Sequence, residues 1–356
     1  MGKRENVSIV GAGIAGLAAA IAAAKSGRKV TVYEKSESFD PIGAGLQLGP
    51  NAVRALQELD AWEVVEPITS APPAIHLRDA RSGKLIKEIK LGKTFDERFG
   101  GPYRVAHRAD LHAALLSIAE GHEAIHIRLG QEYLIADHNS NSPVIAADGV
   151  WSKSRELLFP GTAAITAPDK IFRKLIPRPS RADVSIECVN LWLAPGGHIV
   201  HYPVGQNQRL NLVAVTQGEP PEKHFAASEI LLAIFKSQMD WTTWPAAYVK
   251  PLRKWNSDNT LLIGDAAHGT LPYLAQGAAM ALEDAACLAR TDFDFAKFQM
   301  ARLARCAKLH RQTMQSGKIY HASGIAAQLR NFALAQMPEQ IFLSRLRWLY
   351  AGPSHS

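Results

Sequence analysis

The chain has 356 residues, 47% of them hydrophobic, which is enough for two domains and a sizeable core. Its net charge of +7 forms no single basic block and accompanies no nucleic-acid-binding motif, so nucleic acid is not an expected partner. No segment has the pattern of a membrane span. The three cysteines (Cys188, Cys287 and Cys306) are widely spaced, which predicts no disulfide framework, no metal site and a reducing, cytoplasmic location.

The sharpest local pattern lies near the amino terminus and ends at Glu34. It predicts strands at 6–10 and 29–33, a G-x-G-x-x-G turn and a helix at 17–26. Gly11 permits the tight turn, Gly13 lets the backbone approach a pyrophosphate, and Gly16 allows close packing of helix on strand. Glu34 is spaced to accept a hydrogen bond from a ribose hydroxyl. The pattern therefore predicts dinucleotide binding, with an unphosphorylated adenosine ribose as in FAD or NAD.

The next hundred residues mix turn, strand and helix patterns. A glycine-rich turn at 42–49 precedes a helix that begins near Pro50, and residues 74–91 are typical of antiparallel strands. A helix follows in which Asp110 is the expected N-cap. Arg108, just before it, can reach a phosphate or ribityl group, although an arginine in this position is also typical of a surface.

Two further apolar strands end in short acidic turns, at Asp148-Gly149 and at Gly264-Asp265. The carboxyl ends of parallel strands share one edge of a sheet, so these turns and the G-x-G turn are expected to border one crevice. An alanine-rich helix begins after Gln276 and directs its unpaired N–H groups toward the same place. The alternative is an ordinary strand–turn–helix with a solvated Asp265. No second G-x-G-x-x-G occurs, so one dinucleotide is held permanently and any second nucleotide visits transiently.

Residues 183–216 have the alternating pattern of an antiparallel sheet. His198, Val200 and Tyr202 fall on one face, which can form the wall of a pocket for an aromatic substrate, while His201 falls on the other. The alternative for both histidines is a solvated face or a hydrogen-bonded place in the core, and we favour it for His201. Residues 220–255 are expected to be helical with a link at Trp241 to Pro245, and the chain is expected to stay helical after Thr291.

Several segments, taken in order and spacing, resemble one protein family: GAGIAGLAAA with Glu34, the helix start at Arg108, ADGVWSKSR and IGDAAHGTLPYLAQGAAMALEDA. Together they resemble the single-component, FAD-dependent aromatic monooxygenases, the class of para-hydroxybenzoate hydroxylase. Two more segments, WLAPGGHIVHYPV and KIYHASGIAAQLRN, are similar to the salicylate hydroxylase and 3-hydroxybenzoate 6-hydroxylase branch of that class. The resemblance extends over nearly the whole chain.

The resemblance implies an α/β fold: an FAD/NAD(P)-binding Rossmann-like domain, an inserted antiparallel-sheet substrate domain and a C-terminal helical segment. The expected boundaries are 1–70, 101–170 and 256–296 for the FAD-binding domain, 71–100 and 171–255 for the substrate domain, and 297–356 for the C-terminal segment. The resemblance implies a cytoplasmic monomer or homodimer.

The resemblance also implies a set of site residues. The glycines of the first turn would face the pyrophosphate of FAD, Glu34 its adenosine ribose, and Asp265 its ribityl chain or pyrophosphate. Asp148 is associated in this family with both FAD and NAD(P)H. The full set expected at the cofactor is Gly11, Gly13, Ala15, Gly16, Glu34, Lys35, Gln47, Arg108, Asp148, Asp265, Pro272, Gln276, Gly277 and Ala278. His198 and Tyr202 match the His and Tyr that line the substrate site of the 3-hydroxybenzoate branch, and both are the expected catalytic residues.

The chemistry implied is hydroxylation of a phenolic or aromatic acid, as in the catabolism of aromatic compounds. NAD(P)H, a transient electron donor, reduces the bound FAD, and dioxygen then forms a flavin C4a-hydroperoxide with an electrophilic distal oxygen. A phenolate is electron-rich, so a base near the phenol helps, and His198 is the expected base. The carboxylate of the substrate needs a positive or hydrogen-bonding partner that the sequence does not single out.

The chain departs from the family pattern in three places. Gly269 follows His268 where the family usually has proline, which is expected to loosen the turn, and the stretches 129–144 and 217–255 are short. Two alternatives therefore stay open. One is a flavin monooxygenase of a larger lipid-like or heterocyclic substrate, and the other is an FAD-binding protein whose catalysis the deletions have impaired.

Overall fold

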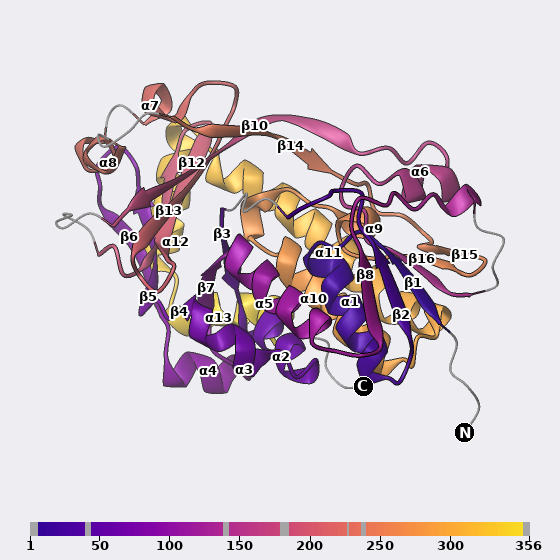
Figure 1. Ribbon diagram of the computed structural model, residues 1–356. Helices are drawn as coiled ribbons and strands as arrows, with labels where there is room; N and C mark the ends of the chain where they lie inside the picture. Colours follow the sequence, from indigo (N-terminus) through magenta and orange to yellow (C-terminus); the bar gives the residue numbers. More distant parts are fainter. Residues whose placement is uncertain are drawn as a thin grey trace.

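The computed structural model describes residues 6–39, 44–137, 142–178, 185–225, 228–235 and 240–351. Its first sheet has six strands in the order β15-β16-β9-β1-β2-β8 (Figure 1). Five of them run parallel: β1 (Val7–Val10), β2 (Val30–Tyr33), β8 (Ile125–Arg128), β9 (Val144–Ala146) and β16 (Thr260–Leu262). The edge strand β15 (Asn256–Ser257) pairs antiparallel. The parallel sheet confirms the predicted Rossmann-like architecture.

Helices cover this sheet and hold the glycine-rich turn in place. Helix α1 (Ile14–Lys25) is almost entirely buried, because its alanines let it pack closely against α10 (Gly277–Arg290) and α5 (Arg108–Glu120). Helix α2 (Pro50–Glu58) packs on α10 and begins at the predicted proline. The prediction of Asp110 as N-cap is wrong: strand β7 (Arg104–His107) runs directly into α5, and the extended residue His107 is its N-cap.

The second sheet has seven strands in the order β14-β10-β13-β12-β11-β5-β6. Their bounds are β5 (Ala74–Asp79), β6 (Leu85–Lys90), β10 (Ile165–Pro177), β11 (Val189–Ala194), β12 (Gly197–Val204), β13 (Arg209–Thr216) and β14 (Thr242–Tyr248). All neighbours pair antiparallel except β11 and β5. Ile199, Leu210 and Leu212 pack with Trp192 on one side. The opposite side of β12 carries His198, Val200 and Tyr202, as the alternation predicts.

The prediction that 220–255 is helical around a Trp–Pro link is wrong. Two short helices, α7 (Pro221–His224) and α8 (Glu229–Phe235), are present, but the link itself is strand β14. β-Branched and aromatic residues favour a strand here. Pro245 is tolerated because β14 is the edge strand of its sheet, where a missing N–H costs no ladder hydrogen bond.

A third, three-stranded sheet was not predicted. It joins β3 (Gly45–Leu48), β7 and β4 (Thr69–Ser70), so part of the predicted glycine-rich turn is a strand. Residues 42 and 43 of that turn lie outside the described residues. The remaining short elements are α3 (Trp62–Val65), η1 (Glu66–Ile68), α4 (Lys93–Phe99), η2 (Ile135–Asp137), α6 (Lys153–Leu158), α9 (Asp265–His268) and η3 (Pro272–Leu274).

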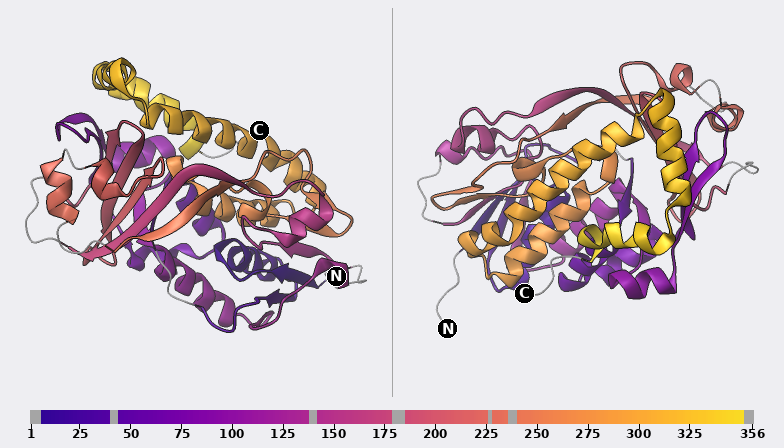
Figure 2. Two further views of the ribbon diagram at one scale, coloured as in Figure 1. Left: turned by 90° about the horizontal axis from the view of Figure 1, so that it is seen from above. Right: turned by 180° about the vertical axis from the view of Figure 1, so that it is seen from behind.

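The C-terminal segment is helical to residue 350, as predicted, and residues 352–356 lie outside the described part. It comprises α11 (Phe295–Tyr320), α12 (Gly324–Gln336) and α13 (Glu339–Tyr350). The long helix α11 crosses the back of the molecule (Figure 2). Within the described ranges, no helix combines the length and the apolar content needed to cross a membrane.

A buried ionic cluster fastens α11 to α10. Arg302 of α11 donates from Nε to Asp284 at 2.7 Å and also pairs with Glu283. Arg305 pairs with Glu283 at 2.5 Å and donates to the backbone oxygens of Trp348 and Leu349 in α13. Three helices are thereby joined through charges that are almost fully buried and mutually compensated.

The domain boundaries themselves stay a prediction. The strands expected in the substrate domain do pair within the seven-stranded sheet, but β10 begins before the expected boundary at residue 170. This strand runs from the neighbourhood of α6 across to β13 (Figure 1).

Candidate active site

The three predicted turns meet at the carboxyl edge of the parallel sheet. Strands β16, β9 and β1 are neighbours, and they lead into Gly264-Asp265, Asp148-Gly149 and the glycine-rich turn. The contacts are close: a Cβ atom added to Gly11 would lie 2.7 Å from the oxygen of Ala147, and one added to Gly264 would lie 2.8 Å from Cβ of Ala15. The convergence predicted from the sequence is therefore present.

The glycines of the first turn serve different purposes. Gly11 has φ +94°, a conformation that favours glycine. A Cβ on Gly16 would lie 1.8 Å from the backbone oxygen of Gly11, so only glycine lets α1 pack this closely. Gly13, by contrast, has no atom within 4 Å of an added Cβ, and it is the N-cap of α1. The backbone at Gly13 is open to a ligand, as a pyrophosphate requires.

Three contiguous cavities surround Gly13. The central cavity contains about 1370 Å³ of space free of protein atoms, partly open to solvent, and lies between the starts of α1 and α10 and the strands β12 and β13. The Glu34 cavity contains about 1300 Å³, and the outer cleft about 2720 Å³. The predicted residues in the central cavity are Gly13, Ala15, Gln47, Arg108, His198, Tyr202, Asp265, Pro272, Gln276, Gly277 and Ala278. Those in the Glu34 cavity are Gly11, Gly13, Glu34, Lys35 and Asp148. Of the predicted set, only Gly16 faces none of these cavities.

The carboxylates of the Glu34 cavity are held by backbone and hydroxyl donors. Glu34 accepts from the backbone N–H of Ala12 at 2.9 Å, which places the acid beside the glycine-rich turn. Asp148 accepts from the Ser152 hydroxyl at 2.5 Å and from the backbone N–H of Ser154 at 3.0 Å. Asp148 thus fixes the start of α6 while it borders the cavity.

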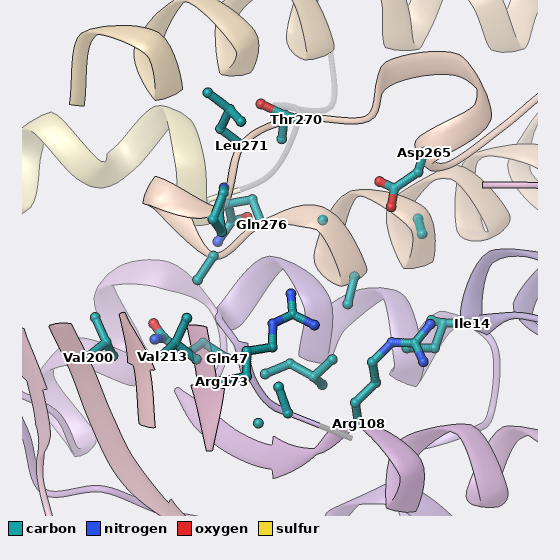
Figure 3. Close-up of a pocket in the computed structure, with 18 of the residues that line it drawn as sticks. Ile14, Gln47, Arg108, Arg173, Val200, Val213, Asp265, Thr270, Leu271 and Gln276 are labelled. Carbon is teal, nitrogen blue, oxygen red and sulfur yellow. The ribbon is translucent and has the colours of Figure 1, made fainter. Parts of the chain in front are cut away.

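Asp265 faces the central cavity next to the start of α10 (Figure 3). Its side chain is exposed to the cavity, yet the surrounding walls exclude enough water to raise its pKa, against the opposing effects of His268 and Arg108. A Cβ on Gly277, the first residue of α10, would lie 3.8 Å from Oδ1 of Asp265, so the carboxylate lies close to the unpaired N–H groups of that helix. The arrangement offers both a hydroxyl acceptor and a positive dipole end to one ligand.

Two backbone hydrogen bonds close the turn at Gly269, where the sequence predicts a looser turn. Its N–H donates to the oxygen of Asp265 at 3.1 Å, and its own oxygen accepts from Val249 at 2.8 Å. Proline could not donate the first of these bonds, so glycine here closes the turn by a different route.

The wall opposite α10 is formed by the outer face of β12 and β13. His198, Val200 and Tyr202 line it together with Val213 and Val215. Burial raises the pKa of Tyr202, so its phenol stays neutral and can donate a hydrogen bond. Burial also lowers the pKa of His198 well below its usual value, and the neighbouring His321 adds to this.

His201 differs from both environments expected for it. It is fully buried beside Trp192, and neither ring nitrogen has a hydrogen-bond partner among the described residues. Burial lowers its pKa to about 3, with Arg78 and His76 contributing, so the ring is neutral. It belongs to the core side of the sheet and not to the cavity.

The cavity also contains an arginine that was not predicted from the sequence. Arg173 comes from β10, and its guanidinium points into the space below Gln276 (Figure 3). Its Nε is buried and has no hydrogen-bond partner in the described part of the chain, and burial lowers its pKa. A buried donor without a protein partner is suited to a ligand that supplies the acceptor. The same strand also carries Lys170 and Lys174, so no local signal in the sequence distinguished Arg173.

One group of side chains has the composition of a metal site. Ligand atoms of His268, Asp284 and Cys306 lie within 4.8 Å of one another. However, Asp284 already accepts from His268 at 2.6 Å, from Arg302 at 2.7 Å and from the N–H of Gly264 at 2.8 Å. Despite burial, Cys306 and Asp284 raise the pKa of His268 well above its usual value, so it is a cation here. The group is accounted for as a buried ion pair that secures the Gly264 turn.

Comparisons with known proteins agree with this geometry. Residues 9–39 match a family model described as an NAD(P)-binding Rossmann-like domain, and residues 140–291 match one described as an FAD binding domain. A 3-hydroxybenzoate 6-hydroxylase of Klebsiella oxytoca is 34% identical over 98% of this chain and 97% of its own length. Another, of Polaromonas naphthalenivorans (strain CJ2), is 31% identical over 97% and 95%. The chain belongs to the FAD-dependent aromatic hydroxylases. The recognised family is confirmed, and with it the assignment as an enzyme.

Solved structures share the fold of this aromatic hydroxylase. A variant of Klebsiella pneumoniae HpxO, complexed with FAD, has a TM-score of 0.86 at 22% identity and covers 98% of this chain and 100% of its own. A salicylate hydroxylase substrate complex has a TM-score of 0.79 at 21% identity, covering 98% and 96%. The alignment to the Klebsiella oxytoca relative spans 387 residues, more than the 356 of this chain, so that relative carries residues with no counterpart here.

FAD is the cofactor of the hydroxylase, and the residues present fit it. The open backbone at Gly13 suits the pyrophosphate, Glu34 and the Glu34 cavity suit the adenosine, and Asp265 with the start of α10 suits the ribityl chain and ring. The role of each individual residue stays a prediction.

Proposed function

We propose that this FAD-dependent hydroxylase acts on a small phenolic acid, with NAD(P)H and dioxygen as co-substrates. The observation that carries the proposal is the presence of His198 and Arg173 in one central cavity that also borders the cofactor residues. A phenolic acid needs a base for its hydroxyl and a cation for its carboxylate, and these two side chains supply them. The relatives named 3-hydroxybenzoate 6-hydroxylase support this substrate class.

When bound, FAD supplies the oxygen chemistry, and the protein supplies binding, orientation and proton transfer. Arg173 binds the carboxylate through its unpartnered Nε, and the aliphatic wall of Val200 and Val213 packs against the ring. Tyr202 donates to the phenolic oxygen and His198 removes the phenolic proton, which makes the ring electron-rich.

The first test is oxidation of NADH and of NADPH with a panel of 3-hydroxybenzoate, salicylate, uncharged phenols and N-heterocyclic acids, with product analysis to separate hydroxylation from peroxide release. Hydroxylated benzoates support the proposal. Hydroxylation of the N-heterocyclic acids alone would establish the alternative substrate class. Flavin whose reduction no compound of the panel accelerates would establish an impaired enzyme. A cytoplasmic location and a monomeric or homodimeric state stay predictions, and sedimentation tests the second.

The second test separates the two side chains. We expect Arg173→Gln to raise KM for the phenolic acid by about 10- to 100-fold, the equivalent of a charged hydrogen bond, with little effect on the matching uncharged phenol. Arg209→Gln, at an exposed position in the same sheet, is the matched control. His198→Ala should lower hydroxylation more than FAD content. Equal effects of Arg173→Gln on both substrates would reject its role.

A further inference from the structure

Behind His198 lies a chain of buried polar groups that leads away from the cavity. Nδ1 of His198 is 3.0 Å from Nε2 of His321, and Nδ1 of His321 is 3.7 Å from Oδ1 of Asp169. The other oxygen of Asp169 accepts from the Tyr273 hydroxyl at 2.8 Å. Oδ1 of Asp169 is buried and has no hydrogen-bond partner in the part of the chain that the structure describes. An unpartnered carboxylate oxygen next to an imidazole is costly unless the two interact.

His198 alone is a poor place to leave a proton. It is only 3% exposed, and its cavity neighbours Val200, Val213 and Val215 offer no charge to compensate an imidazolium. Burial lowers its pKa well below the usual value for this reason. His321 is better placed, because it faces the Asp169 carboxylate and is the C-cap residue of the 26-residue helix α11, whose dipole favours a cation there.

The hydrogen-bond partners decide the tautomers. If His321 donated from Nε2 to His198, its Nδ1 lone pair would face the Asp169 carboxylate, which is repulsive. The opposite arrangement places a proton on Nδ1 of His321, where it points at the unpartnered Oδ1 of Asp169. His198 then carries its proton on Nδ1, and its Nε2 is left free to accept.

Resting on the proposed function, we propose that His321 and Asp169 form a proton relay behind His198. The phenolic O–H bond breaks and its proton passes to Nε2 of His198, while the Nδ1 proton of His198 passes to Nε2 of His321. The phenol becomes a phenolate, His198 returns to a neutral ring, and the positive charge resides on His321 beside Asp169. Return of the proton along the same path restores the starting state, so no co-reactant is consumed. His321 and Asp169 are positioning residues that act through His198.

Other charged or titratable groups also face His321. Tyr273 of η3 and Tyr320 of α11 pack near the histidine pair, with the Tyr273 ring 5.5 Å from that of His321. Burial has the largest effect on His321 and lowers its pKa, Asp169 opposes this, and His224 of α7 and Arg330 of α12 lower it further, so the pKa lies below its usual value. Arg330 is engaged with the backbone oxygens of Ile319 and Tyr320. Asp169 is therefore the acid in this set that can stabilise a protonated His321.

The test uses the holoenzyme and the pH dependence of the ultraviolet difference spectrum of bound 3-hydroxybenzoate, which reports phenolate formation without turnover. We expect Asp169→Asn and His321→Gln to raise the pH at which the bound phenol ionises by about 1–2 units, a 10- to 100-fold loss of phenolate at a fixed pH. KM and FAD content should change little, and kcat should fall with the same shifted pH profile. His126→Gln, at an exposed position of β8 in the other sheet, is the matched control and should leave the ionisation unchanged.

An unchanged ionisation pH in both variants overturns the relay. A lower FAD content and a raised KM without a shift in the ionisation pH also overturn it, because they indicate a structural role. A wild-type enzyme that binds no phenol rejects the proposed function and the relay together. An independent measurement needs no substrate: nitrogen NMR of the histidine rings in the wild-type holoenzyme should show the Nδ1–H tautomer of His198. The Nε2–H tautomer would overturn the relay even if every variant failed to fold.

Discussion

Two glycines of the same turn are expected to respond to alanine in opposite ways. At Gly16 the added Cβ would lie 1.8 Å from the backbone oxygen of Gly11, so helix and turn must separate by about 1.5 Å to restore an ordinary contact. Neither partner is a flexible side chain, so we expect the upper end of the overpacking range, a loss of about 3 kcal/mol in the free energy of unfolding. FAD binding should weaken as well, because α1 moves away from its site.

At Gly13 the added Cβ meets no atom within 4 Å, and φ −73° is accessible to alanine. Alanine is a poorer N-cap than glycine, but it also restricts the unfolded chain, and the two effects of about 0.5–1 kcal/mol offset each other. The stability of the flavin-free protein should therefore stay the same. FAD affinity should fall by about 10- to 100-fold, because the methyl group keeps the phosphates away from the backbone N–H groups.

The assays are urea unfolding of the flavin-free proteins and fluorescence titration with FAD, for both variants and the wild type. The expected pattern is loss of both properties for Gly16→Ala and loss of affinity alone for Gly13→Ala. Equal destabilisation by the two substitutions, or wild-type affinity of Gly13→Ala, would refute the assignment of separate roles.

Three further expectations concern the surroundings of the cavity. Asp265→Ala should yield largely colourless protein of normal stability, because its side chain faces the cavity; full flavin content on purification would contradict its role. In spite of burial, Arg302 lowers the pKa of Glu283 to about 2, and His268 with Arg302 lowers that of Asp284 to about 2. The stability that the two carboxylates contribute is therefore present above pH of about 4 and is lost as the pH falls toward 2. Urea midpoints that stay flat between pH 5 and 2.5 would refute this. Gly45→Ala would place a Cβ 2.6 Å from the Tyr202 ring, so the ring must move. KM for the aromatic substrate should therefore rise by at least about tenfold, while FAD content is kept. An unchanged KM would show that Tyr202 does not define the pocket.

The cofactor side of the site was predictable because its signals are local in the sequence. A glycine pattern, an acid at a fixed spacing and strands that end in acidic turns follow from the geometry of a parallel sheet alone. The alternation in β12 likewise placed His198 and Tyr202 on one face.

The rest of the site depends on tertiary contacts that carry no local signal. His198 and His321 are 123 positions apart, and they meet because α11 ends against β12. Arg173 and Asp169 lie in a strand that no motif distinguishes. Strand β14 was not predicted because it contains Pro245. A proline is tolerated in a strand only at the edge of a sheet, so the assignment of β14 required the strand order.

Strand β10 supplies one residue to the proposed relay behind His198 and one to the central cavity. It carries Asp169 and Arg173 four positions apart, and its pairing with β14 shifts register between Thr166 and Lys170. An irregularity in a ladder is where a strand bends most easily, and here it lies beside the carboxylate that would stabilise a protonated His321. Any change in the curvature of this strand would displace the carboxylate and the guanidinium in concert. Efforts to enlarge the substrate range should therefore vary the aliphatic wall of Val200 and Val213 and leave the curvature of β10 intact.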